Sequence, residues 1–222
     1  MLLIIESFFI TFICYFIAKR LSRYFSRVPV LVLGMFCVIA MLTLVRLPYD
    51  AYSQGTHDIF GRLLGYVTVA LAIPLATMRY DDLPLKSLSG ILCFASLSAV
   101  VLPVSLAYVL HMAHPTILAF TTRAVTTPIA INIANLVGSP VSLVILIVIL
   151  SGLIGASFSS LILKNIHDER ASGLALGLAA HAIGTVQAWQ RGPVAGRYAA
   201  FGMAVNGVFT AIWLPLAFHL LQ

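Results

Sequence analysis

The most restrictive feature of this sequence is a series of apolar runs, each about 17 to 25 residues long, that recur from end to end. Each run is long enough to cross a hydrocarbon core of roughly 30 Å as a helix. Of the 222 residues, 61% are hydrophobic and 9% are charged, which is too apolar for a soluble domain. The sequence therefore predicts an all-α, polytopic bundle of transmembrane helices in a lipid bilayer, with a single integral membrane domain over residues 1–222.

About seven or eight hydrophobic segments are expected, two of them broken or re-entrant. Their approximate ranges are 2–18, 28–47, 60–78, 87–110, 116–137, 141–163, 172–190 and 198–220. A polar outer loop is expected after Leu47, continuing to Asp58. The segments 116–137 and 172–190 each contain a polar interruption, and paired interruptions of this kind are typical of transporter binding sites. An inverted repeat is one explanation of the pairing, and the sequence leaves it open.

The basic residues indicate an orientation in the membrane. Four of them follow the first segment: Lys19, Arg20, Arg23 and Arg27. Short loops rich in Lys and Arg lie in the cytoplasm, so the N-terminus is expected outside, and the net charge of +6 is no sign of a nucleic-acid partner. If segment 116–137 returns to its starting side instead of crossing, the loops 164–170 and 191–197 exchange sides. Each loop holds two basic residues, so the charge count does not decide whether the segment crosses.

The stretch 123–132 is unusually polar for a membrane segment, with Arg123, Thr126, Thr127, Pro128 and Asn132. Pro128 lacks an amide donor and disfavours helical geometry at the residue before it. A break there would direct free amides and two hydroxyls into the membrane interior, where the N-terminus of the next half-helix favours negative charge. The alternative is a simple kink whose hydroxyls bond to the preceding turn. Asn132, on the half-helix after the break, would bind solute or bridge helices.

Arg123 is a charged residue at a depth where no acidic side chain is expected. The carboxylates are assigned to loops or to the outer end of the first segment, at Glu6. A guanidinium in this position either snorkels to the interface or faces an anion, and its planar fork fits a carboxylate. The sequence therefore favours a small anionic substrate.

The second polar interruption contains His181, Gly184 and Thr185, with His181 and Thr185 one helical turn apart. An intramembrane histidine can hydrogen-bond a carboxylate or exchange a proton, or it can be a satisfied core residue. Asn206 in the last segment is a further candidate for the same site. Together these residues predict a site shared by the two interrupted segments.

Other kinds of chemistry find no support in the sequence. It contains no HExxH, Walker, Gly-x-Ser-x-Gly or dinucleotide-binding motif, and its three cysteines lack metal-ligand spacing. We therefore expect no enzymatic activity, no cofactor and no metal site.

Three motifs in order resemble the LrgB/CidB family of YohK-like membrane proteins. They are Val-Thr-Thr-Pro-Ile-Ala at 125–130, His-Ala-Ile-Gly-Thr at 181–185 and Asn-Gly at 206–207. Some positions differ from the usual family pattern: Arg123 replaces a lysine, Asn132 a glutamate, Gln187 an arginine and Gln190 a glutamate, while alanines at 124 and 180 replace serines. Three charges of the family pattern are thus amides in this chain.

The resemblance implies a function in the bacterial inner membrane. The family was named for antiholin-like regulation of murein hydrolase export, and its members usually work with a smaller LrgA/CidA-like membrane protein. A plastid glycolate/glycerate transporter is similar to a fusion of the two types, which implies 2-hydroxy or 2-oxo monocarboxylates such as glycolate, glycerate, lactate and pyruvate as substrates. We therefore expect a carboxylate transporter; the alternative is a regulator or pore component in cell lysis. A homo-oligomer is left open.

Overall fold

The computed structural model describes residues 2–25, 28, 30–70, 73 and 85–221, and all regular structure within these ranges is helical. The chain forms two compact units, Met1–Val67 and Thr68–Gln222. Each unit is described by itself, and the single domain expected over residues 1–222 stays a prediction.

The first unit consists of α1 (Leu2–Leu21), α2 (Val30–Val45) and most of α3 (Tyr49–Ala70). α1 packs on α2 through a cluster that contains Ile10, Cys14 and Leu42. α2 ends at Val45; the next residue, Arg46, has a positive φ of 55°, and the chain bends by 119° into α3. The polar outer loop expected after Leu47 is therefore wrong, because its residues form the first turns of α3. The end of the third expected segment, beyond residue 73, lies outside the described residues.

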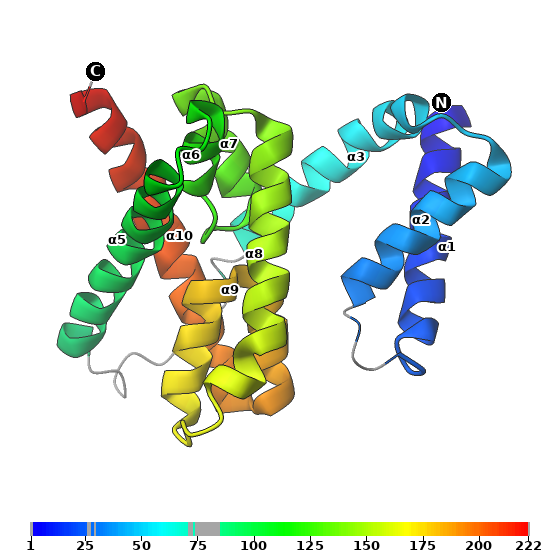
Figure 1. Cartoon of the computed structure of the whole chain (residues 1–222). Coiled ribbons are helices and arrows are strands. Elements are labelled where there is room, and N and C mark those ends of the chain that lie inside the picture. Colours follow the sequence, from blue (N-terminus) through cyan, green and yellow to red (C-terminus); the bar gives the residue numbers. More distant parts are fainter. Residues whose placement is uncertain (1, 26–27, 29, 71–72, 74–84, 222) are drawn as a thin grey trace. The chain divides into compact units, whose positions relative to one another are not determined.

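The second unit contains α5 (Leu85–Val109), α6 (His114–Phe120), α7 (Thr127–Val137), α8 (Val141–Ile162), α9 (Glu169–Arg191) and α10 (Pro193–Leu221) (Figure 1). Three helices of the described ranges are long and apolar enough to cross a membrane: Leu88–Val109, Val141–Ile162 and Pro193–Leu220. A fourth is added if α2 and the start of α3 form one bent span. The fold is thus an all-α, multi-pass membrane bundle.

Seven or eight hydrophobic segments are expected from the sequence, more than the three or four candidate spans. The residues of the individual segments explain the difference. α1 carries Glu6 near one end and Lys19 and Arg20 at the other, and α2 alone has only 16 residues. The two interrupted segments are the main cause, since neither forms one straight helix.

α6 and α7 are the two arms of a hairpin beside the first half of α8. Ala119 of α6, Ala130 of α7 and Val144 of α8 belong to one buried cluster. A straight span over residues 114–137, antiparallel to α8, would place Ala119 beside the second half of α8 instead. Gly138 closes α7 in a left-handed conformation, with φ of 70°, and starts the return into α8. Residues 114–137 therefore enter and leave at the same end of α8, the end where α8 begins.

α9 is a second hairpin, folded sharply at His181, whose φ and ψ of 40° and −126° are not helical. A straight helix of this length would separate its ends by about 33 Å. Instead, a Cβ built on Gly192 would lie 2.9 Å from Oε2 of Glu169, so the two ends are adjacent. Its arms, 169–180 and 182–191, pack with the start of α10 through a cluster that contains Leu176, Ala188 and Ala195.

The two hairpins point toward each other from opposite ends of α8. Figure 1 shows α6 and α7 beside its upper half and α9 beside its lower half. Opposed broken elements are what an inverted repeat produces, although the repeat itself stays a prediction. The expectation of two broken segments is confirmed.

Candidate functional site

The tip of the first hairpin is the linker 121–126, which is almost wholly buried. The hydroxyls of Thr121 and Thr122 end α6 by donating to carbonyls one turn back, at 2.7 and 3.2 Å. Thr126 is the N-cap of α7 and has an extended backbone, with φ of −70° and ψ of 148°. Pro128 follows in the first turn, where a missing amide hydrogen costs no helical bond. The predicted break at the Thr-Thr-Pro motif is therefore present.

The tip of the second hairpin is His181, which is 4% exposed. Its Nε2 lies 3.1 Å from the carbonyl oxygen of Val148 in α8. A carbonyl only accepts, so Nε2 carries a proton and donates it. Gly152 makes this contact possible, because a Cβ there would lie 2.6 Å from Cε1 of the imidazole.

Arg123 extends from the first tip to the same turn of α8. Its Nη1 donates to Oγ of Ser151 at 3.3 Å, close to the middle of the 22-residue helix. This contact places the guanidinium at mid-helix rather than at an interface, which argues against snorkelling. Arg123 and His181, from opposite hairpins, therefore reach α8 within one helical turn.

In the described part of the chain, no acidic side chain forms an ion pair with Arg123. The ion pair found there joins Arg170 to Asp168, outside the membrane-spanning helices. Two helix N-termini, those of α7 and of the arm 182–191, also lie at the tips, and their dipoles favour negative charge. The electrostatics of the centre thus suit an anion.

Asn206 of α10 completes the first tip by donating from Nδ2 to the carbonyl oxygen of Ala124 at 2.9 Å. Its own Oδ1 is buried without a partner, and so is Oγ1 of Thr126. The next residue, Gly207, allows close approach, because a Cβ there would lie 2.9 Å from Cδ1 of Ile129. Asn206 is thus held against the linker.

The other predicted residues of the second tip have internal partners. Thr185 donates through Oγ1 to the carbonyl oxygen of His181 at 2.8 Å and also contacts Sδ of Met203 at 3.6 Å. A Cβ on Gly184 would overlap the carbonyl oxygen of Leu176, so its lack of a side chain lets the two arms approach. Both residues shape the tip, and a direct role in binding stays a prediction.

Asn132 is the one predicted site residue that the structure leaves apart from the others. It lies exposed in α7, on the face away from the buried Ala130 and Ile133. Gln190 is exposed as well, near the end of α9, whereas Gln187 is half-buried. Two of the three positions at which this chain lacks a family charge are therefore not at the hairpin tips.

Sequence reasoning missed the contribution of α8. Val148, Ser151 and Gly152 contact the two tips, yet they sit in an uninterrupted apolar run, where small residues usually indicate helix packing. The Ser-Gly pair in the middle of that run is only a weak signal, because small residues in an apolar helix usually serve packing.

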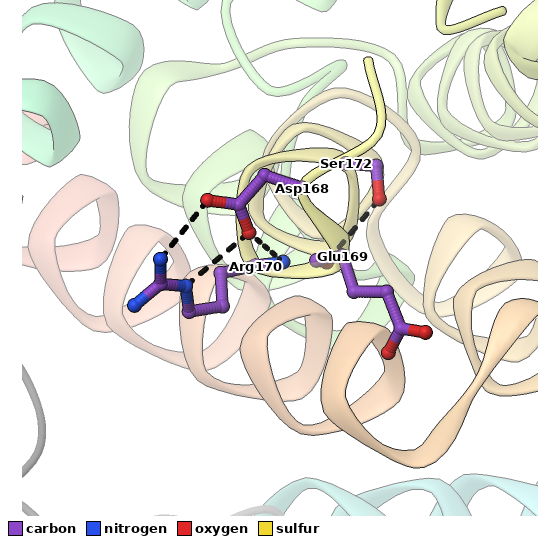
Figure 2. A network of polar contacts seen from close by, with 4 residues as sticks. All are labelled: Asp168, Glu169, Arg170 and Ser172. Atoms are coloured by element: carbon purple, nitrogen blue, oxygen red, sulfur yellow. Dashed lines mark hydrogen bonds and ion pairs between the residues drawn. The ribbon is translucent and has the colours of Figure 1, made fainter.

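The start of α9 is held by a separate polar network outside the membrane-spanning helices (Figure 2). Asp168 is the N-cap and accepts the backbone amide of Arg170 at 2.8 Å as well as its guanidinium. These hydrogen bonds from Arg170 hold the pKa of the Asp168 carboxyl below its usual range. Neither here nor elsewhere in the described ranges do three or more potential metal ligands gather.

Comparisons with known proteins find similarity over almost the whole chain. Residues 11–220 match the LrgB-like family. The chain is 30% identical to the uncharacterized protein YwbG of Bacillus subtilis, over 95% of this chain and 96% of that protein. It is 28% identical to an uncharacterized protein of Haemophilus influenzae (96% and 94% covered) and 26% identical to the holin-like protein CidB of Staphylococcus aureus (93% and 92%). No solved structure matches the chain.

Proposed function

This chain belongs to the LrgB-like family, and we propose that it carries small monocarboxylates, 2-hydroxy or 2-oxo acids, across the bacterial inner membrane. The substrate would lie between the tips of the two hairpins on α8. Arg123 would neutralise the carboxylate, with Thr126, Thr127 and the free backbone amides in the first turn of α7 as hydrogen-bond donors. His181 and Thr185 would close the site from the second tip, and Asn206 from α10.

The observation that carries this proposal is the unbalanced charge of Arg123 at mid-helix. A guanidinium away from water needs an anion or several acceptors, and the hydroxyl of Ser151 is a single neutral one. A substrate carboxylate that binds there supplies a negative charge and two oxygen atoms that match the planar guanidinium. Opposed hairpins that both reach the middle of α8 also suit alternating access, since movement of either one would open the site to one side.

The charges of the second unit support an orientation. The end where α8, α9 and α10 join holds four basic residues: Lys164, Arg170, Arg191 and Arg197. The joins 110–113 and 138–140, at the other end of α8, hold no Lys or Arg. We therefore place the α8–α9 and α9–α10 joins in the cytoplasm. The N-terminus outside and an LrgA/CidA-like partner remain part of the same proposal.

Uptake into proteoliposomes tests the carrier function. Arg123→Gln should lower uptake of glycolate, glycerate, lactate or pyruvate by about 10- to 100-fold, because a hydrogen-bonded charge is lost. Arg191→Gln is the matched control, since Arg191 is exposed at the end of α9 and should not matter. If Arg123→Gln transports these acids as fast as the unmodified chain, Arg123 does not bind the substrate and the proposal fails.

A regulatory or pore-forming role in cell lysis is the second candidate. It is favoured by the name of one relative, the holin-like protein CidB of Staphylococcus aureus. A chain with this role would show no saturable carboxylate flux, yet would co-purify with its LrgA/CidA-like partner and change dye leakage from vesicles. Saturable flux by the chain alone would contradict it.

A further inference from the structure

Two buried oxygen atoms beside the first hairpin tip lack hydrogen-bond partners. They are Oγ1 of Thr126 and Oδ1 of Asn206, in side chains that are 7% and 2% exposed. The other two such atoms among the described residues are the hydroxyls of Ser7 in α1 and Ser139 in the α7–α8 turn. Buried polar atoms are almost always paired, so two unpaired ones at one tip mark a place where a polar molecule can bind.

The orientation of the Asn206 amide is determined by its neighbour. The carbonyl oxygen of Ala124 only accepts, so the nitrogen of the amide must face it, at 2.9 Å. The atom left without a partner is therefore the oxygen, which can only accept a hydrogen bond. A group that donates a proton has to approach Asn206 to satisfy it.

The rest of this tip offers donors. Thr126 is an N-cap residue whose hydroxyl makes no capping bond, so this hydroxyl is free to donate. Arg123 and the free amides at the N-terminus of α7 are donors as well. The tip thus combines several donors with one unpaired atom that can only accept, Oδ1 of Asn206.

Resting on the proposed carboxylate site, we propose that this tip selects 2-hydroxy acids over 2-oxo acids. The carboxylate takes the donors of Arg123, Thr126 and α7, and the 2-hydroxyl donates to Oδ1 of Asn206. A 2-oxo acid presents only acceptors, so its keto oxygen would leave Oδ1 unpaired and facing another oxygen.

A bound cation would also satisfy Oδ1, but the surroundings disfavour it. The guanidinium of Arg123 and the positive end of the α7 dipole both belong to this tip, and the part of the chain that the structure describes brings no carboxylate to it. Because both unpaired oxygens are closed off from solvent, the ligand reaches them only when the tips separate.

Binding of three-carbon acids to the full chain in proteoliposomes tests this selection. Lactate, pyruvate and propionate have the same length and differ at carbon 2. Lactate, in at least one enantiomer, should bind about tenfold or more tightly than either of the others. Asn206→Ala should bring this ratio close to one. Thr210→Ala, which removes another buried polar side chain one turn along α10, should leave the ratio unchanged.

Other results would contradict the proposed selection, and one of them would also contradict the carboxylate site. Equal binding of the three acids, or an Asn206→Ala ratio like that of the unmodified chain, overturns the selection while the carrier function stands. Sodium-dependent binding without preference for lactate means that Oδ1 serves a cation, which also overturns it. If none of the three acids binds, the selection and the proposed carboxylate site both fall.

Discussion

At the scale of single residues, Gly152 decides whether the second tip can reach α8. The imidazole of His181 occupies the space where a side chain at position 152 would lie. Gly152→Ala should displace the ring, destabilise the fold by about 1–3 kcal/mol through overpacking, and reduce carboxylate uptake. The control is Gly90→Ala in α5, where an added Cβ has no neighbour within 4 Å. Thermal unfolding and uptake measure the effect; equal behaviour of both variants would contradict it.

Arg123 and His181 were predictable as site residues because polarity in an apolar segment is visible in the sequence. Ser151 was not, since a single serine in a long apolar run is usually packing, and only the fold shows that it contacts Arg123. Asn132 is the opposite case, a residue that the sequence predicted for the site and that the structure places elsewhere. It lies in the polar stretch, but the phase of α7 after the break turns it away from the buried face.

At the scale of elements, the positions of both breaks followed from local chemistry. Pro128 disfavours helical geometry at the residue before it in the Thr-Thr-Pro motif, and His181 lies in the second predicted interruption. The sequence could not predict whether each interrupted segment crosses or folds back as a hairpin, because this depends on which half of α8 each arm contacts. The loop after Leu47 was misassigned for another reason, since the polar residues in the first turns of α3 resemble a loop in the sequence.

Folding of α9 into a hairpin predicts that its two ends are on the same side of the membrane. Asn165→Cys and Gln190→Cys, both exposed, should react with a membrane-impermeant thiol reagent from the cytoplasmic side, and Met112→Cys from the opposite side. The background should lack the native Cys14, Cys37 and Cys93. Labelling of positions 165 and 190 from opposite sides would show that α9 crosses the membrane.

Asp168 gives the start of α9 a pH dependence. Hydrogen bonds from Arg170 lower the pKa of its carboxyl in the folded state, so its contribution is present above the unfolded pKa and is lost as pH falls through the folded value. Asp168→Asn keeps the cap but removes the charge. The Tm difference between the unmodified chain and this variant should be positive at pH 7 and shrink below about pH 4. A difference that stays constant to pH 3 would contradict this role.

At the scale of the whole molecule, the second unit brings three elements to one point: two hairpin tips and the middle of α8. Its basic residues gather at one end, whereas Arg123 stands alone at the centre of the described helices. Composition predicted a membrane bundle, and the position of Arg123 inside an apolar segment predicted a site of positive charge. The convergence on Val148, Ser151 and Gly152 is a property of the packed helices, which no single segment encodes.

The most direct test of a carboxylate site between the tips is protection of position 151. In a chain without native cysteines, Ser151→Cys should react with a small thiol reagent, and saturating lactate or glycolate should slow this reaction about tenfold or more by occupying the site. Propane-1,2-diol, which lacks the carboxylate, should give no protection. A reaction rate at position 151 that is the same with and without every one of the proposed acids would contradict the account.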